Sequence, residues 1–166
     1  IRERDTMARK PLDVALAKAA GAQIVFAPEA GQLYPKGFRT RVEVDGLSTV
    51  LEGATRPGHF RGVATVVLKL FQIVQPTAAY FGQKDYQQSV IIRRMAQDLN
   101  CPVAVRVMPT VRKPEGLAMS SRNAYLSSEE RRQAPVIFEA LQEARAAIRR
   151  GERRASRLTR RLRAAM

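Results

Sequence analysis

Two short polar stretches carry residue types that bind phosphate groups. The first is Gly82-Gln83-Lys84-Asp85, and the second, later in the chain, is Met119-Ser120-Ser121-Arg122. A lysine supplies a mobile positive charge for phosphate oxygens, glycine permits close backbone approach, and an aspartate can accept hydrogen bonds from ribose hydroxyls. Two hydroxyls and a guanidinium can hold a polyphosphate chain. Together the two stretches favour a nucleoside triphosphate site.

Lys84 and Arg122 are the candidate catalytic residues. Their charges would stabilise the negative charge that develops as pyrophosphate departs, which is electrostatic catalysis rather than proton transfer. Each stretch alone also allows a structural interpretation, in which Asp85 caps a helix and the serines form a turn before another helix. The sequence contains neither GxxxxGK[ST] nor GxGxxG, so the common nucleotide fingerprints are absent.

The elements around the first stretch have the order of a parallel sheet. Residues 77–81 read as a short strand, 86–99 as a helix with one apolar side, and 102–107 as a second, alternating strand. Such a rhythm is typical of α/β folds. The first stretch would then lie at the carboxyl end of a strand, where open sheets bind ligands, and at a helix start, whose amides attract anions.

Four further elements are expected before that sheet. The pattern predicts a helix over about 5–20, a buried strand over 23–27 and an edge strand over 39–44. The apolar run 63–74 is predicted to be a mostly buried helix, because about twelve residues exceed the usual length of a strand.

After the second stretch the sequence becomes helical and then strongly basic. Ser127 and Glu130 form a capping box, and apolar positions continue to Ile148, so one helix is expected there before Gly151 breaks it. The net charge is +14, and the segment 145–163 holds nine arginines against one glutamate, more than half of this excess. Such a segment is either a solvated or partner-covered helical face, or a polyanion-binding tail.

The composition of the chain excludes several classes of protein. The chain has 166 residues and one cysteine, Cys101, so an internal disulfide framework is excluded. The single histidine, His59, has no neighbouring ligand residues, and no metal site is predicted. No apolar run approaches the roughly 20 residues of a membrane span. We expect a soluble, cytoplasmic protein without membrane partners.

The sequence resembles the pantoate–β-alanine ligase (pantothenate synthetase) family. Several motifs occur in the order and spacing of that family, and they cover most of residues 20–140. The matching segments are Leu33-Tyr34-Pro35 with Gly37, Glu52-Gly53, Arg56-Pro57, His59-Phe60, Gly62-Val63, Thr65-Val66-Val67, Tyr80 to Gln88, Pro109 to Arg112, Gly116 to Asn123 and Tyr125-Leu126.

The resemblance implies an α/β fold with a Rossmann-like nucleotidyltransferase parallel sheet. Residues 1–123 would form the second part of that nucleotide- and pantoate-binding domain, and 124–166 the start of a small, mainly helical C-terminal domain. The implied reaction joins pantoate and ATP, with Mg²⁺, into pantoyl adenylate and pyrophosphate. The amine of β-alanine then displaces AMP to give pantothenate.

The resemblance also implies roles for individual residues. Gly82 and Asp85 would hold the ribose, Lys84 a phosphate group, and Val111 the adenine through its backbone. Gln88 would bind pantoate, while Phe81 and the segment 63–67 would line the apolar side of the pantoate pocket. The full implied ATP-binding set is Gly82, Gln83, Lys84, Asp85, Val111, Met119, Ser120, Ser121 and Arg122.

Two departures from the family pattern qualify this expectation. Gln83 stands where the family usually has glutamate, in GEKD. The family's opening half, with an MGALHEGH-like segment and its catalytic histidines, finds no counterpart here, so the chain is expected to be a fragment that is inactive alone. Members of the family are commonly dimers, which predicts a homodimer for the full-length protein. The alternative is a basic nucleic-acid-binding module that uses the arginine-rich end; nucleic acid is not the expected partner.

Overall fold

The computed structural model describes residues 12–165 of the chain. The chain divides into two compact units, Ile1–Arg41 and Val42–Met166, which are described separately below. The domain boundary expected between residues 123 and 124 stays a prediction.

The described part of the first unit, residues 12–41, contains two short helical segments. Residues 12–19 are helical, as expected, and the chain leaves this helix at Gly21, whose φ is +90°; the predicted residues 5–11 lie outside the described range. Helix α2 spans Ala30–Leu33. The buried strand expected over 23–27 is wrong, because these residues pair with no strand in the described range and Ile24 is 88% exposed. A β-branched run becomes a strand only where a second backbone satisfies its N–H and C=O groups.

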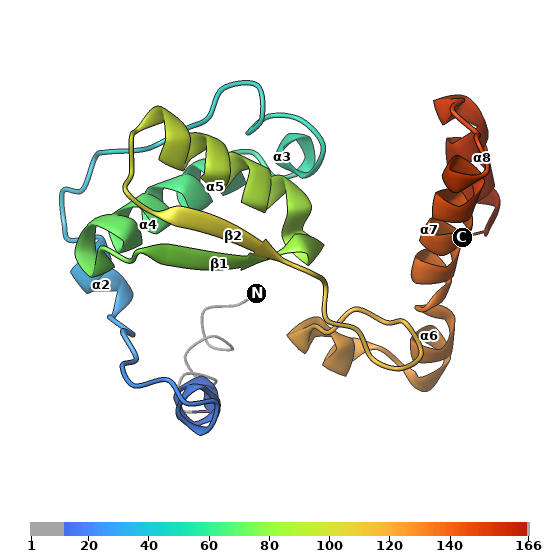
Figure 1. Ribbon diagram of the computed structural model, residues 1–166. Coiled ribbons are helices and arrows are strands. Elements are labelled where there is room, and N and C mark those ends of the chain that lie inside the picture. The colour runs from blue at the N-terminus through green and yellow to red at the C-terminus, as the bar shows by residue number, and fades with distance from the viewer. Residues whose placement is uncertain (1–11, 166) are drawn as a thin grey trace. The chain divides into compact units, whose positions relative to one another are not determined.

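The second unit is built on two parallel strands (Figure 1). Strand β1 spans Ala78–Gly82 and β2 spans Ala104–Met108, with Ala78 opposite Ala104 and Gly82 opposite Met108. The two predicted strands are therefore confirmed with shifts of one or two residues. Their carboxyl ends lie at the same edge of the sheet.

Helices α4 (His59–Val74) and α5 (Tyr86–Asp98) cover one face of this sheet (Figure 1). Both helices were predicted from their apolar residues, although α4 begins at His59 rather than at residue 63. The core between them and the strands is apolar; its buried members are Val44, Phe60, Ala64, Val67, Phe71, Ile91, Ile92, Met95 and Ala96. Phe81 of β1 meets Phe71 of α4 edge to face, with ring centroids 6.5 Å apart. This packing fixes the direction in which β1 leads into the first polar stretch.

The edge strand expected over 39–44 is also wrong. Within the second unit, the backbone N–H of Val42 donates to Thr65 Oγ1 at 2.9 Å, and that of Val44 donates to Ser48 Oγ at 3.3 Å. Side-chain hydroxyls thus take the backbone donors that a neighbouring strand would otherwise have received. The short helix α3, Glu52–Thr55, follows this segment.

The last part of the chain forms three helices, α6 (Ser128–Gln133), α7 (Val136–Arg149) and α8 (Ala155–Ala165). The predicted capping box is confirmed: Ser127 N–H donates to Glu130 Oε2 at 2.8 Å, and Glu130 N–H donates to Ser127 Oγ at 3.2 Å. The single helix expected up to Ile148 is instead divided at Pro135, because proline has no N–H to continue the helical ladder but suits the start of a new helix.

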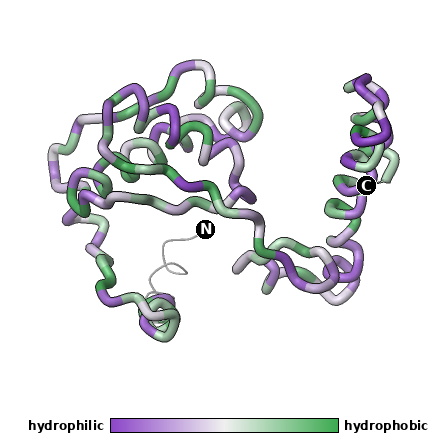
Figure 2. The backbone as a smooth tube through the Cα atoms, in the orientation of Figure 1, coloured by the Kyte–Doolittle hydropathy of each residue, from purple (hydrophilic) through white to green (hydrophobic). Residues whose placement is uncertain are grey.

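Helices α7 and α8 pack against each other (Figure 1) and alternate between hydrophobic and hydrophilic residues along their length (Figure 2). Gly151, with φ +99°, separates them as predicted. Glu152 accepts the backbone N–H groups of Arg154 and Arg153 at 2.9 and 3.0 Å, and these bonds, with the Arg157 guanidinium, lower the pKa of its carboxyl. None of the helices within residues 12–165 is both long and apolar enough to cross a membrane.

Candidate functional site

The first polar stretch lies where the sequence placed it, between a strand and a helix. Gly82 is the last residue of β1, and Gln83, Lys84 and Asp85 form the single-turn 3₁₀ helix η1 directly before α5. All four residues are exposed at the carboxyl end of β1. This is the edge at which open α/β sheets bind ligands.

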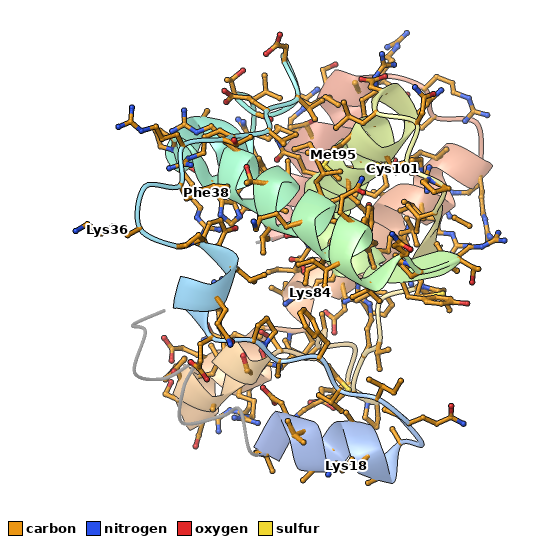
Figure 3. All side chains as sticks on the ribbon, turned by 90° about the vertical axis from the view of Figure 1, so that its left-hand side faces the viewer. Lys18, Lys36, Phe38, Lys84, Met95 and Cys101 are labelled. Atoms are coloured by element: carbon orange, nitrogen blue, oxygen red, sulfur yellow. The ribbon has the colours of Figure 1, made fainter. Side chains whose placement is uncertain are left out.

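The side chains of Lys84, which is labelled in Figure 3, and of Asp85 make no hydrogen bond or ion pair in the described part of the chain. Asp85 immediately precedes α5, yet its side chain accepts no hydrogen bond from the first turn of that helix. The interpretation of Asp85 as a helix cap is therefore wrong. Both the ammonium and the carboxylate are available to a ligand.

The second polar stretch follows a narrow loop that leaves β2. The backbone N–H of Met119 donates to the carbonyl of Val111 at 2.9 Å, and Arg112 and Ala118 form an antiparallel bridge. The loop turns at Gly116, whose φ is +96°. Val111 and Met119, both expected to bind ATP, are thus neighbours, and their side chains are 66% and 56% exposed.

Ser120, Ser121 and Arg122 lie at the start of the 3₁₀ helix η2, which spans Ser121–Tyr125. Ser120 Oγ accepts the backbone N–H of Arg122 at 3.2 Å, while Ser121 and Arg122 are exposed. The amide of Asn123 donates to the carbonyl of Ala118 at 3.0 Å and holds η2 against the preceding loop. Two hydroxyls and one guanidinium are thereby gathered on a single turn.

A cavity of about 780 Å³ lies between η1, the loop after β2 and one side of α7. Its lining residues are Gln83, Lys84, Tyr86, Pro109, Thr110, Arg112, Ala118, Ile137, Phe138, Leu141, Gln142 and Arg145. Three of them are cationic, and among the described residues that line it none is acidic. The cavity therefore suits an anionic ligand with an apolar part.

This cavity gathers some of the predicted site residues but not others. Gln83 and Lys84 line it, whereas Gly82, Asp85, Val111 and the stretch 119–122 are not among its lining residues. Gly82, Asp85 and Val111 are each adjacent in the sequence to a lining residue, and the stretch 119–122 directly follows the lining residue Ala118.

The reasoning from sequence missed the part of the cavity that α7 contributes. Phe138, Leu141, Gln142 and Arg145 recur at intervals of three and four residues, which places them on one face of a helix. That spacing could have indicated a shared helical face, but Gln142 and Arg145 on this face look like ordinary solvent-exposed residues in the sequence. Only the tertiary structure shows that this face borders η1.

The predicted pantoate residues occupy a different environment. Phe81 is half-buried against Phe71, and Gln88 is half-buried in the first turn of α5. Neither lines the cavity. In α4, Val63 and Val66 are half-buried and Val67 is buried, as an apolar wall would be. Their roles toward pantoate stay predictions.

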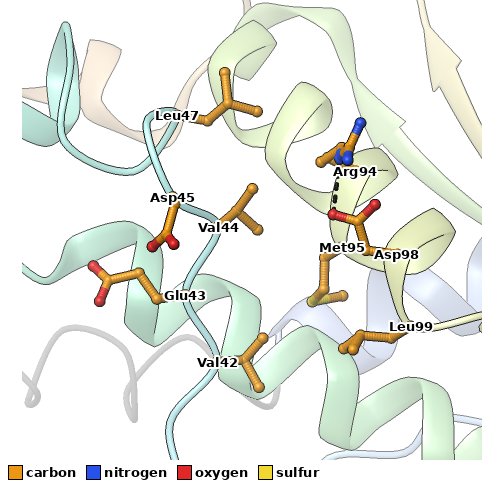
Figure 4. Close-up of a pocket in the computed structure, with 9 residues that line it drawn as sticks. All are labelled: Val42, Glu43, Val44, Asp45, Leu47, Arg94, Met95, Asp98 and Leu99. Atoms are coloured by element: carbon orange, nitrogen blue, oxygen red, sulfur yellow. Dashed lines mark hydrogen bonds and ion pairs between the residues drawn. The ribbon is translucent and has the colours of Figure 1, made fainter.

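A second cavity, of about 490 Å³, lies beside α5 and contains none of the predicted site residues (Figure 4). The apolar side chains of Val42, Met95 and Leu99 line it together with an ion pair in which Arg94 Nε lies 2.7 Å from Asp98 Oδ2. Residues 12–165 contain no group of three histidine, cysteine, aspartate or glutamate side chains that could hold a metal ion.

Comparison with known protein families shows which family this chain belongs to. The family model described as pantoate-beta-alanine ligase matches residues 8–166. The chain belongs to the pantoate–β-alanine ligase family. The expected resemblance is therefore confirmed.

Curated members of the pantoate–β-alanine ligase family are closely similar in sequence. The pantothenate synthetase of Herpetosiphon aurantiacus is 56% identical over 149 residues, which cover 90% of this chain and 52% of that protein. That of Moorella thermoacetica is 53% identical over 156 residues, which cover 92% of this chain and 55% of that protein. The chain spans about half the length of the curated relatives it matches.

Solved structures of the pantoate–β-alanine ligase family share the fold. Pantothenate synthetase from Thermus thermophilus superposes with a TM-score of 0.88 at 51% identity, over 93% of this chain and 56% of that one. The ligase from Francisella tularensis, solved in complex with β,γ-ATP and β-alanine, superposes with a TM-score of 0.74 at 35% identity, over 93% of this chain and 57% of that one. The α/β fold with a parallel sheet is thereby confirmed, and the nucleic-acid-binding alternative gains no support from these matches.

Proposed function

We propose that this chain forms part of an enzyme that condenses pantoate with β-alanine at the expense of ATP. The observation that carries the proposal is the pairing of family membership with unpartnered Lys84 and Asp85 at the carboxyl end of β1, beside a cavity lined by cations. In the first step the pantoate carboxylate attacks the α-phosphate of ATP and releases pyrophosphate. In the second step the β-alanine amine attacks the acyl carbon of pantoyl adenylate and releases AMP.

The chain's own residues would bind and orient the nucleotide. The ammonium of Lys84 and the guanidinium of Arg122 stabilise negative charge on the phosphates as pyrophosphate leaves, and neither group moves a proton. Asp85, with Gly82, holds the ribose because a free carboxylate accepts hydrogen bonds from hydroxyl groups. The proposed assignments of Gln83, Val111, Met119, Ser120 and Ser121 to ATP and of Gln88 and Phe81 to pantoate belong to the same proposal.

Mg²⁺ would accompany the ATP and would be held mainly by the phosphates of the nucleotide and by water. Residues 12–165 contain no group of three histidine, cysteine, aspartate or glutamate side chains that could hold the ion by itself, and Mg²⁺ bound to a nucleotide needs only one or two carboxylates from the protein. No step is therefore assigned to the metal. A homodimeric assembly of the whole protein and a cytoplasmic location are further parts of the proposal that rest on family membership alone.

A chimera tests the activity without depending on how much of a whole enzyme this chain represents. The matched 56% of the Thermus thermophilus enzyme is replaced by this chain, and pantothenate formation from pantoate, β-alanine and ATP is measured. We expect turnover, and we expect Lys84→Ala to lower kcat about 100- to 1,000-fold, the usual effect of removing a charge-stabilising donor. Lys18→Ala, at an exposed position in the helix 12–19, is the control and should leave kcat unchanged.

Two results would contradict the proposal. A folded chimera that makes no pantothenate would show that this chain does not supply the site. A fully active Lys84→Ala chimera would show that Lys84 has no part in it.

A further inference from the structure

The side of α7 that faces the 780 Å³ cavity ends in two polar residues, Gln142 and Arg145. Phe138 and Leu141 supply the apolar part of the same face. Helix α7 therefore does more than pack on α8, because it presents one amide and one guanidinium to the cavity that Lys84 lines.

The cations of this cavity differ in whether they already have partners. Arg112 donates from Nη1 to the carbonyl of Gly116 at 3.0 Å, and its guanidinium lies 4.1 Å from the centroid of the Phe138 ring. Lys84 and Arg145 make no hydrogen bond or ion pair within residues 12–165. Two cations are thus left without partners around one cavity.

Four of the ten other arginines in residues 128–165 have side-chain partners. Arg131 donates to the carbonyl of Asn123, Arg132 pairs with Glu129, Arg153 donates to the carbonyl of Ile148, and Arg157 pairs with Glu152. Arg145 has no such partner, and among the arginines of residues 128–165 it is the one that lines the cavity with Lys84. Like charges from η1, the loop and α7 repel one another unless an anion lies among them.

The chemistry of the lining selects the kind of anion. A guanidinium binds two oxygens of one phosphate in a fork, and an ammonium acts as a point charge on another. The side-chain amides of Gln83 and Gln142 add uncharged donors. Cations from three separate elements match a ligand whose charges are spread along a chain, which favours a polyphosphate over a single carboxylate.

We propose that Arg145, assisted by Gln142, is a further binding residue for the polyphosphate chain of the nucleotide, supplied by α7 toward the cavity that Lys84 lines. This inference rests on the proposed function for the identity of the nucleotide. The choice of a polyphosphate as the ligand rests on the three cations that line the cavity. By holding the phosphates from a second element, α7 links nucleotide binding to the position of the C-terminal helices.

The test measures binding of three probes to the purified 166-residue chain: inorganic tripolyphosphate, ATP and AMP. Arg145→Gln keeps the length and polarity of the side chain but removes the charge. We expect its Kd for tripolyphosphate and ATP to rise about 10- to 100-fold, the usual range for a lost charge-assisted hydrogen bond. The Kd for AMP should change less than about twofold, because AMP lacks the β- and γ-phosphates.

Arg149→Gln is the matched control. Arg149 lies one turn further along α7 and is exposed outside the cavity, so its removal lowers the net charge equally. It should leave all three Kd values unchanged. If Arg145→Gln fails to give the circular dichroism spectrum of the folded chain, Arg145→Lys replaces it, and a loss of affinity for tripolyphosphate is still expected because lysine cannot form the fork.

Three outcomes overturn the inference: no tripolyphosphate binding by the unsubstituted chain, unchanged tripolyphosphate binding by the Arg145 variant, or an equal loss in the Arg149 control. The pantothenate assay of the chimera separates this result from the fate of the proposed function. An active chimera with unaltered tripolyphosphate binding by Arg145→Gln removes only the role of Arg145. An inactive chimera with Arg145-dependent tripolyphosphate binding removes only the ligase proposal.

Discussion

The guanidinium of Arg112 lies over the ring of Phe138, 4.1 Å from its centroid. Arg112 belongs to the loop after β2 and Phe138 to α7, so this contact joins the loop that precedes Ser120 to the C-terminal helices. The hydrogen bond from Arg112 to the carbonyl of Gly116 fixes the same side chain from the loop's own side. The wall of the cavity therefore depends on a contact between residues far apart in the sequence.

A double-mutant cycle measures the contribution of this contact. Arg112→Met removes the charge, and Phe138→Leu removes the aromatic face while keeping an apolar side chain. We expect a coupling free energy of about 0.5–1 kcal/mol in urea unfolding, the range for a partly exposed cation–π pair. Strictly additive effects of the two substitutions would show that the two side chains do not interact in solution.

Gly116→Ala should destabilise the chain more than a glycine substitution at a comparable backbone angle. A Cβ at Gly116 would lie 2.6 Å from Phe138 Cδ1, whereas Gly151, with a similar φ of +99°, has nothing within 4 Å of the same position. Both substitutions cost about 1–3 kcal/mol of backbone strain, but only Gly116→Ala adds a clash of about 1–3 kcal/mol. Equal unfolding free energies for the two variants would contradict the close packing of Phe138 on this turn.

The parts of the fold that the sequence predicted are those that local patterns specify. Helix α4 follows from an apolar run too long for a strand, and the Ser127–Glu130 capping box follows from two residues three positions apart. The strand predictions for segments 23–27 and 39–44 were wrong because a strand also needs a second backbone to pair with. The backbone N–H groups of Val42 and Val44 instead donate to the hydroxyls of Thr65 and Ser48. No sequence pattern within 39–44 reveals these two bonds.

The candidate site likewise contains residues that were predictable from the sequence and residues that were not. Lys84 and Asp85 were predictable because they directly follow a strand, and the carboxyl ends of strands gather ligand-binding residues. The part played by Arg145 was not predictable, because whether it lines the same cavity as Lys84 depends on where α7 lies after the break at Pro135. Sequence spacing shows which residues share a helical face, but not what that face meets.

Gln87→Glu is predicted to loosen the segment before α3. The Gln87 amide nitrogen donates to the carbonyls of Leu47 and Val50 at 3.0 and 2.8 Å, and its oxygen accepts the N–H of Glu52 at 3.2 Å. A carboxylate has no N–H to donate and would repel both carbonyls, so a loss of about 1–3 kcal/mol is expected.

Amide hydrogen exchange checks this prediction residue by residue. In the Gln87→Glu variant the amide of Glu52 should exchange faster. Amides in the centre of α4 should lose only as much protection from exchange as the fall in global stability accounts for. Gln97→Glu, at an exposed position on α5, adds the same charge and should change stability by less than about 0.5 kcal/mol. Unaltered exchange at Glu52 would show that Gln87 does not hold this segment.

The capping box at α6 should make stability depend on pH in a defined direction. The backbone N–H of Ser127, and secondarily its side chain, lower the pKa of the Glu130 carboxyl. Since the folded pKa lies below the unfolded one, the stabilisation is fully present above the unfolded value of about 4.3 and is lost as pH falls through the folded value.

Glu130→Gln isolates this effect, because glutamine can still accept the Ser127 N–H but carries no titratable charge. We expect the urea midpoint of the unsubstituted chain to exceed that of Glu130→Gln at pH 6, and the difference to shrink steadily between pH 5 and pH 3. Glu143→Gln, at an exposed position in the middle of α7, is the control and should show no such convergence. A difference between the unsubstituted chain and Glu130→Gln that stays constant down to pH 3 would mean that the Ser127 N–H does not favour the ionised carboxylate over the neutral amide.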